Sequence, residues 1–240
     1  MHEDLDLLRA WRLGDRRAGN ALFNRHFNAI LRFFRNKVDE QVEDLVQRTF
    51  VACVESRDRF REDSSFRTYL FGVANNVLRH HYRLRQRDAR TVSFETHSIV
   101  DLGAGPLTLC EVKREQRLLL EGLRRIPLDC QVVLELFYWE RFTGAEIGQI
   151  LELPENTARS RLRRARRQLK QALQELAKSP LELESTLSDL DAWAESVRGE
   201  LTSLERGRER PRHGQGRERR ARSLLGLRHR TPVEVELPLG

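Results

Sequence analysis

The sequence predicts an all-α protein: two small helical domains joined by a flexible linker, the second a helix-turn-helix, plus a C-terminal amphipathic helix and a basic tail. Apolar residues recur at intervals of three and four from about residue 5 to 87, and again from about 110 to 177. This is the period of a helix with one buried face. In the first of these runs no stretch shows the alternation of a half-buried strand. Between the two helical runs, Gly and Pro interrupt the pattern and mark a linker.

Composition favours a polyanionic partner. The 240 residues carry a net charge of +7, with a pI near 9.9, and 33% of them are charged. Simple solubility would account for the charge alone, but the arginines cluster, as an electrostatic footprint for phosphates requires.

The cysteines and the N-terminus predict a reducing, cytoplasmic location without membrane insertion. Cys53, Cys110 and Cys130 lie far apart, and no pair has the spacing of a zinc or redox motif, so we assign all three to the core. The chain begins with acidic residues and no long apolar run follows, so no signal peptide is predicted.

Four helices are predicted in the first domain, residues 5–90. Gly14 ends the first, and the third begins with acids, including Glu43 and Asp44, which suit a helix N-terminus. The fourth runs from about residue 66 to 86, after a polar loop at 57–65. The apolar positions assigned to the first three are Leu5, Leu8, Trp11 and Leu13; Ala21, Phe23, Phe27, Ile30, Leu31 and Phe34; and Val42, Leu45, Val46, Thr49, Phe50 and Val54.

A linker at 91–109 precedes the second domain, residues 110–178. Ile126-Pro127 breaks the helical pattern before a helix at 129–139. Residues 145–169 then read as two helices joined by a tight turn. Ile147, Ile150, Leu151 and Leu153 bury the first of these, and Asn156 or Thr157 is predicted to cap the second.

The second helix of this pair is the strongest nucleic-acid signal. Ala158, Leu162, Ala165 and Leu169 form an inward stripe, whereas residues 159–170 hold seven Lys or Arg and no acid. A helix anchored on one side and lined with arginines on the other suits the major groove. The alternative is a solvated basic face on an ordinary bundle helix.

The fourth helix of the first domain carries a second basic run. The run extends from Arg79 to Arg90, includes Arg83 and surrounds His80 and His81. Its positive charge would attract phosphates. The two histidines point about 100° apart and cannot share a metal. Four aromatic residues precede this run: Phe60, Phe66, Tyr69 and Phe71. They could pack in the core or form a platform on which unstacked bases stack, and we assign Phe66 and Phe71 to the core.

Two blocks of the sequence resemble the extracytoplasmic-function sigma factors, the compact two-domain group of the bacterial sigma-70 family. The first is VEDLVQRTF at 42–50, followed by DRF at 58–60, SF at 65–66, YL at 69–70 and VANN at 73–76. It resembles the domain that grips the promoter −10 element. The second, residues 125–169, resembles the −35-binding domain and has TARSRL at 157–162. Together the blocks cover roughly residues 5–175.

The resemblance implies a role for each surface. Asp44 and Gln47 would dock on the β′ clamp helices of RNA polymerase. Asn76 and the loop would receive a base flipped from the −10 strand; an amide offers both donors and an acceptor to a base edge. The loop residues concerned are Arg61, Asp63 and Ser64, and the residues that would touch the −35 element are Arg159, Ser160, Arg163 and Arg164. Arg161, Arg166 and Arg167 would instead hold phosphates or bridge to polymerase.

Three departures from the family pattern accompany the match. Arg48 stands where members usually carry an acid, which removes one polar clamp contact. Glu152 occupies a turn position where the family often has Gly. Glu155-Asn156 replaces a small residue and Gly, and Asn tolerates a left-handed backbone.

The predicted function is therefore that of a sigma factor. Its partners would be the polymerase core, through the β′ clamp helices and the β subunit, and promoter DNA, with an anti-sigma factor as a candidate. No Gly-rich phosphate loop, nucleophile–His–acid grouping or metal cluster is visible, so no catalysis, cofactor or metal is predicted. The alternatives are a stand-alone helix-turn-helix regulator, which would not need the first domain, and a nuclease, which would need clustered carboxylates.

The family does not account for residues 181–240. Residues 181–205 are acidic, with leucines at helical spacing that predict an amphipathic helix, and 206–240 form a basic tail predicted to be disordered. The acidic helix would fold back and compete with DNA for the basic surfaces. The arginine tail would instead add phosphate contacts, and a passive extension is the third possibility.

Overall fold

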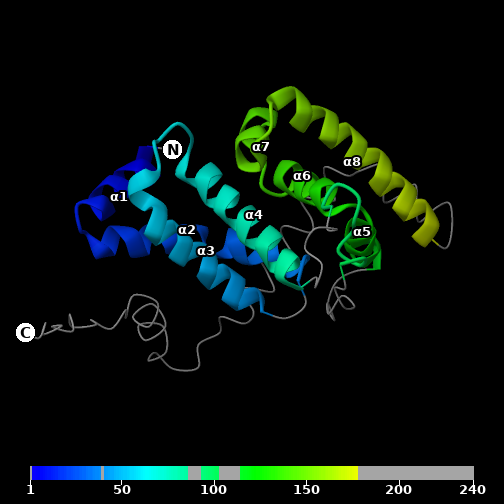
Figure 1. The fold of residues 1–240 in the computed structure, drawn as a ribbon, viewed down its shortest axis with the longest axis horizontal. Helices are drawn as coiled ribbons and strands as arrows, with labels where there is room; N and C mark the ends of the chain where they lie inside the picture. Colours follow the sequence, from blue (N-terminus) through cyan, green and yellow to red (C-terminus); the bar gives the residue numbers. More distant parts are fainter. Residues whose placement is uncertain (1, 39–40, 86–92, 103–113, 178–240) are drawn as a thin grey trace, which may run out of the picture. The chain divides into compact units, whose positions relative to one another are not determined.

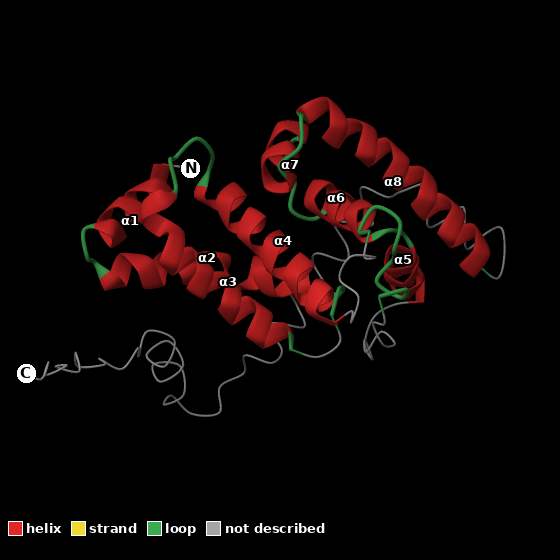
Figure 2. Ribbon diagram, viewed as in Figure 1, coloured by secondary structure: helices red, strands yellow, loops and turns green. Residues whose placement is uncertain are grey.

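The computed structural model describes residues 2–38, 41–85, 93–102 and 114–177, and all regular structure in these ranges is helical (Figure 2). The all-α prediction is confirmed for this part of the chain. The α-helices are α1 (His2–Arg12), α2 (Arg16–Arg35), α3 (Val42–Ser56), α4 (Phe66–Arg85), α5 (Arg114–Arg125), α6 (Leu128–Tyr138), α7 (Gly144–Leu151) and α8 (Glu155–Leu176), with a short 3-10 turn, η1, at Arg57–Arg59.

Helices α1 to α4 form a first helical group, and their boundaries follow local chemistry. Gly14, at φ +100°, ends the α1 segment in a backbone conformation that favours glycine. Asp15 caps α2, because its carboxylate accepts from the backbone N–H of Arg17 at 2.8 Å and of Ala18 at 3.3 Å.

Three core assignments in this group are wrong. Leu13 is 90% exposed, because it lies beyond the end of α1, where the helical period no longer applies. Ala21 and Phe27 are also exposed, because the buried stripe of α2 is rotated by one residue from the predicted one. That stripe consists of Leu22, His26, Ile30, Phe33 and Phe34, with Ala18 and Gly19 at its start.

Helix α4 is the central element of the described structure. It packs against α3 on one side and α7 on the other (Figure 1). Its buried face includes Phe66 and Phe71, which confirms their assignment to the core. Near its end, the Tyr82 hydroxyl donates to the backbone carbonyl of Lys37.

Helices α5 to α8 form a second helical group around α6. All residues of α6 from Leu128 to Leu136 are buried, because α5, α7, α8 and the end of α2 surround them. Cys130 lies here, as Cys53 does in α3, and both thiols are buried. Burial raises the pKa of Cys53 to about 12 and that of Cys130 to about 11.

Residues 93–102 fall in the range predicted as a linker, yet they pack against the second group. Phe94, Ile99 and Leu102 are buried. The segment also pairs with the start of α6: the Leu128 N–H donates to the carbonyl of His97 and the Asp129 N–H to that of Phe94, both at 3.0 Å. Gly and Pro marked the loss of helical period here, but three spaced apolar residues suffice to anchor a segment.

Ion pairs join the two helical groups. Those described are Lys37–Glu135, Arg67–Glu140, Arg32–Glu140 and Arg79–Asp129. Lys37 is fully buried, and its ammonium also donates to the Phe33 carbonyl at 2.6 Å. Burial lowers the pKa of Lys37, and the facing Glu135 carboxylate opposes part of that shift.

Several sequence predictions lie outside the described residues. They concern the acids at 39–40, Arg90, Cys110, the amphipathic helix at 181–205 and the basic tail at 206–240. Within the described ranges, no helix is both long enough and apolar enough to cross a bilayer.

Candidate nucleic-acid interface

The exposed face of α8 is the first candidate surface. Its inward stripe is buried as predicted: Ala158, Leu162, Ala165 and Leu169 are each at most 9% exposed. The four residues predicted to touch DNA, Arg159, Ser160, Arg163 and Arg164, are all exposed. Helical spacing alone separates the two sets, because the buried residues recur at intervals of four, three and four and the exposed residues occupy positions between them on the other side of the helix.

The arginines of α8 differ in how they are held. Arg159 pairs with Glu155, one turn earlier, at 2.5 Å, and its side chain is 64% exposed. Arg164 donates to the Glu95 carbonyl at 3.3 Å. Arg161 is only 14% exposed and bridges the carboxylates of Asp129 and Glu95 at 2.8 and 2.7 Å. Arg161 is thus an internal contact here, whereas Arg159, Arg163 and Arg164 point outward.

Arg166 makes a different internal contact. Its guanidinium lies over the rings of Phe137 and Tyr138 at 5.2 and 5.4 Å from their centroids. Two of the three arginines assigned to phosphates or polymerase, Arg161 and Arg166, therefore help to hold α8 against α6 and the segment at 93–102.

The turn between α7 and α8 sets the direction of this face. Glu152 adopts a left-handed conformation, with φ 56° and ψ 44°, at the position where the family pattern favours Gly. A capping box formed by Thr143 and Glu146 begins α7. A Cβ on Gly148 would lie 2.8 Å from the Leu153 carbonyl oxygen, so only Gly allows the two segments to approach so closely.

The predicted cap of α8 is wrong. The helix begins at Glu155 with Pro154 as its N-cap residue, and no side chain caps it. Asn156 and Thr157 lie inside the first turn, so Asn156 is helical and its tolerance of a left-handed backbone is not used. Pro154 accounts for the earlier start, because its fixed φ and missing N–H suit the residue before a helix.

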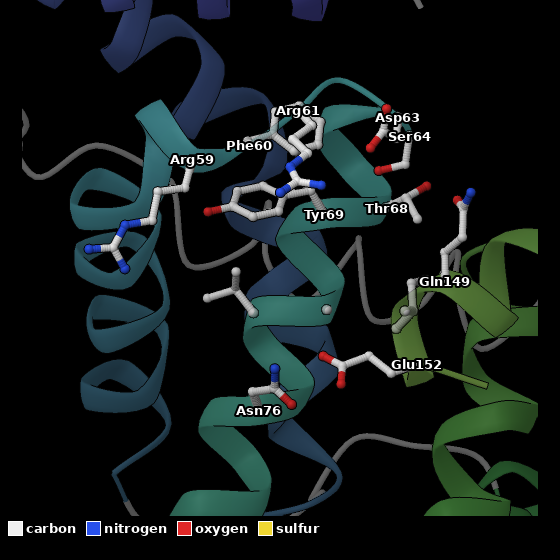
Figure 3. A pocket seen from close by; sticks show the side chains of 13 residues that line it. Arg59, Phe60, Arg61, Asp63, Ser64, Thr68, Tyr69, Asn76, Gln149 and Glu152 are labelled. Carbon is white, nitrogen blue, oxygen red and sulfur yellow. The ribbon is translucent and has the colours of Figure 1, made fainter.

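A pocket of about 330 Å³ beside the start of α4 is the second candidate surface (Figure 3). The loop before α4 and the exposed side of α4 supply most of its lining, and α7 supplies the rest. The lining residues are Arg59, Phe60, Arg61, Asp63, Ser64, Thr68, Tyr69, Gly72, Val73, Asn76, Gln149, Ile150 and Glu152. Four predicted residues, Arg61, Asp63, Ser64 and Asn76, thus come together in one site.

The aromatic residues left open by the sequence divide between core and pocket. Phe66 and Phe71 are buried, whereas Phe60 and Tyr69 are half-buried and stack, with centroids 4.6 Å apart and planes at 29°. The Tyr69 hydroxyl hydrogen-bonds with Ser56 Oγ at 2.5 Å. A fixed aromatic pair at a polar rim is a surface on which a base can stack.

Asn76 is exposed and lies at the far end of the pocket from Phe60 and Tyr69 (Figure 3). The preceding Asn75 is buried. The structure therefore distinguishes the two adjacent asparagines, and only Asn76 is accessible to a ligand in the pocket.

The α7 wall of the pocket was not predicted. Gln149 and Glu152 belong to the helix-turn-helix segment, more than 70 residues from the loop, yet they face α4 across the pocket (Figure 3). A Cβ on Gly72 would lie 3.7 Å from the Ile150 carbonyl oxygen, so the two helices are already close at this point. Neither the spacing of apolar residues nor a sequence motif indicates which remote residues will meet in this way.

Arg79 and Arg83 lie further along α4. The Arg79 guanidinium donates to Asp129 at 2.5 Å and lies 5.1 Å from the Phe94 ring centroid. Arg83 is exposed and lies 5.6 Å from the same ring. The Asp129 carboxylate is thus the anion that Arg79 binds in this structure, and Arg161 binds it as well.

The start of α3 carries the predicted polymerase contacts. Gln47 is exposed, and Asp44, with its side chain 44% exposed, pairs with Arg48 at 2.8 Å. The residue that departs from the family pattern therefore partly neutralises one of the two predicted docking residues.

Among the residues that the structure describes, no three His, Cys, Asp or Glu side chains are arranged to hold a metal ion. His80 is exposed, while burial and the nearby Arg85 lower the pKa of His81.

Comparison with known proteins finds the same family in both helical groups. Residues 22–88 match the Sigma-70 region 2 family, and residues 116–169 match Sigma-70, region 4. The ECF RNA polymerase sigma-E factor of Haemophilus influenzae is 26% identical over 175 residues, covering 68% of this chain and 91% of that protein. The RNA polymerase sigma factor HrpL of Pseudomonas syringae pv. syringae is 32% identical over 145 residues, covering 60% and 79%.

A solved structure shares the fold. CnrH, in complex with the cytosolic domain of CnrY, matches with a TM-score of 0.55 and 26% identity, covering 73% of this chain and 99% of the CnrH chain. The pocket loop and Asn76 fall within the first family match, and the exposed face of α8 falls within the second.

Proposed function

Because the chain belongs to the extracytoplasmic-function sigma factors of the sigma-70 family and directs RNA polymerase to promoters, we propose that its two candidate surfaces divide the promoter between them. The pocket beside α4 would take the −10 element as single-stranded DNA. The exposed face of α8 would read the −35 element as duplex. RNA synthesis itself would remain the work of the core enzyme, with which this protein would share the cytoplasm.

One observation carries the −10 assignment: the stacked Phe60–Tyr69 pair stands in the same pocket as Asn76 and the polar rim. A base that leaves the duplex loses its stacking energy. Stacking on an aromatic side chain restores about 1–3 kcal/mol per base. The pocket, at about 330 Å³, lies within the usual range for small-ligand sites. Asn76, at the far end of the pocket from the aromatic pair, would then read the edge of another base of the same strand, since its amide both donates and accepts.

The −35 assignment depends on charge and exposure. Arg159, Arg163 and Arg164 lie on the solvent side of a helix whose other side is packed in the core. An arginine can bind guanine through two hydrogen bonds, worth about 1–3 kcal/mol of discrimination. We assign base reading to Arg163 first, because Arg159 and Arg164 already have partners in Glu155 and the Glu95 carbonyl.

Polymerase docking would use α3, through Asp44 and Gln47. The Asp44–Arg48 pair joins exposed groups, and such pairs contribute about 0–1 kcal/mol, so a partner helix can displace it at little cost. CnrH was solved with a protein partner, the cytosolic domain of CnrY, and on that likeness we propose that an anti-sigma factor binds this chain as well.

The experiment that tests the division is the variant Asn76→Ala in holoenzyme with purified core. Run-off transcription and permanganate reactivity near −10 report opening, while a −35 duplex reports closed binding. We expect reduced opening with unchanged duplex binding and unchanged association with core. Asn28→Ala is the matched control, because Asn28 is an exposed asparagine on α2, away from the pocket. Unchanged permanganate reactivity in Asn76→Ala would remove Asn76 from the base pocket.

A further inference from the structure

The loop that forms the rim of the −10 pocket is held from outside the segment that carries it. Residues 57–65 join α3 to α4, and Glu62 adopts a left-handed backbone with φ 61°, which costs a non-glycine residue conformational energy. Contacts from elsewhere in the fold must therefore determine this conformation. They come from α1.

Arg12, the last residue of α1, joins three residues of the loop through one guanidinium. Nε and Nη2 donate to the Arg57 carbonyl at 3.2 and 2.8 Å, and Nη2 also donates to the Phe60 carbonyl at 2.5 Å. Nη1 donates to the Glu62 carboxylate at 2.7 Å. The planar fork of arginine makes these contacts together, which a single ammonium group cannot do.

The position of Arg12 is itself fixed by packing. Trp11 is buried, and its ring meets Phe23 edge to face at a centroid distance of 5.0 Å. A Cβ on Gly19 would lie 2.7 Å from that ring, so α1 approaches α2 as closely as glycine allows. The Arg57 guanidinium lies over the Trp11 ring, 5.2 Å from its centroid. The residue that precedes Arg12 is therefore closely packed.

The contacts of Arg12 bear directly on the pocket. Holding the Phe60 carbonyl fixes the residue whose ring stacks on Tyr69, and holding Glu62 fixes the residue between Arg61 and Asp63 of the rim. The hydrogen bond from Arg9 and the charges of both arginines lower the pKa of Glu62, which keeps its carboxylate ionised. Helix α1 precedes the residues that match Sigma-70 region 2, so the family match assigns nothing to Arg12.

We propose that Arg12 is a positioning residue for promoter opening: its guanidinium preforms the Phe60–Tyr69 platform and the polar rim before single-stranded DNA enters. This inference rests on the proposed −10 role of the pocket. Preformation matters because ordering a loop at the moment of binding reduces affinity and relaxes selectivity.

The test compares Arg12→Lys with Arg9→Ala in reconstituted holoenzyme. Arg12→Lys keeps the charge and loses the fork. Arg9 also binds Glu62, at 2.9 Å, but its side chain is 60% exposed and the described contacts do not link it to the loop carbonyls, so Arg9→Ala is the control for charge. The probe is a random-sequence pool of single-stranded DNA, bound to holoenzyme and sequenced.

We expect wild-type holoenzyme to prefer one base at one position of the bound strand. In Arg12→Lys that preference should fall by about tenfold, because a loop without the arginine fork no longer holds the platform and the rim in the arrangement that distinguishes bases. Arg9→Ala should keep the preference, and duplex −35 binding should be unchanged in both. Base preference is a ratio of affinities, so it does not depend on the fraction of the variant that folds. If Arg12 contributed only to the stability of the fold, the base preference would stay unchanged.

Two results would overturn the proposal: Arg12→Lys with wild-type base preference, or Arg9→Ala with the same loss as Arg12→Lys. Failure of the −10 assignment itself has a different signature. In that case wild-type holoenzyme shows no base preference in the pool, and Asn76→Ala changes nothing.

Discussion

The exposed face of α8 and the pocket beside α4 offer DNA two different kinds of surface. The α8 face belongs to one helix, and its side chains point outward because the opposite stripe is buried. The pocket draws residues from the loop at 59–64, from α4 and from α7, and α1 holds its rim. A binding face on one helix requires only that apolar residues recur on the opposite side of that helix. A pocket depends on the placement of every element that forms its walls.

Charge divides the two surfaces in the same way. The pocket lining carries two arginines, Arg59 and Arg61, and two acids, Asp63 and Glu152, so its formal charges balance. Elsewhere on α4, Arg67 and Arg79 pair with Glu140 and Asp129, each at 2.5 Å. On α8, Arg163 is exposed. Binding through α8 should therefore depend strongly on salt. Binding in the pocket should depend more on stacking and fit.

The largest expected effect concerns the buried contact between the two helical groups. Glu135→Ala leaves the Lys37 ammonium buried without its carboxylate, so we expect the free energy of unfolding to fall by about 3–5 kcal/mol, measured by urea denaturation. The double variant Lys37→Met/Glu135→Leu should recover most of this loss, because no buried charge remains. Glu3→Ala is the control, since it breaks an exposed pair with Arg25. A loss below about 1 kcal/mol for Glu135→Ala, typical of surface pairs, would contradict the prediction.

The next effect sharpens the −35 side. If Arg163 reads a base, Arg163→Ala should weaken binding to the cognate duplex by about 1–3 kcal/mol. Binding of the variant to a duplex of unrelated sequence should change little. Arg167→Ala, also exposed on α8, should instead weaken all sequences alike and lower the salt slope by about one unit. Titrations of each variant with the cognate and the unrelated duplex, at several salt concentrations, measure both the affinity and its salt dependence. An equal loss on both duplexes for Arg163→Ala would make it a phosphate contact.

The smallest effect is a pH dependence confined to the first helical group. Burial lowers the pKa of His26, with the Asp4 carboxylate at 2.9 Å opposing the shift and the cations Arg67 and Arg25 adding to it. In the unfolded chain the imidazole titrates near 6.5. The unfolded state therefore binds more protons as pH falls through that value, and stability should decrease by at most about 1.4 kcal/mol per pH unit.

Thermal melts between about pH 7.5 and pH 5.5 test this, with the ordinary His pKa of about 6.5 near the middle of the range. The variant His26→Gln should flatten the dependence. The His26 ring packs near Phe66, at the start of α4, with centroids 5.7 Å apart, so the effect belongs to the pocket side of the molecule. If His26→Gln keeps the full dependence, another group is responsible.

Helical period was sufficient for most of the fold. It predicted the four helices of the first domain, a helix at 129–139, two helices within 145–169, the inward stripe of α8 and the burial of Phe66 and Phe71, because a helix that buries one face must repeat apolar residues every three or four positions. Its errors lie at element ends and edges. Leu13 follows the last turn of α1, Phe27 sits at the margin of the buried stripe of α2, and Pro154 starts α8 before the expected cap.

The sequence by itself determined the chemistry of this protein: the all-helical fold, the outward arginines of α8, and the loop and asparagines that resemble a −10 reader. The tertiary structure alone decided which of these groups meet. It exposes Asn76 and buries Asn75, pairs Arg79 and Arg161 with Asp129, brings Gln149 and Glu152 to the pocket, and extends Arg12 to the Phe60 carbonyl. The physical reason is distance along the chain, because local period specifies the face of a helix but not which remote residue packs against it.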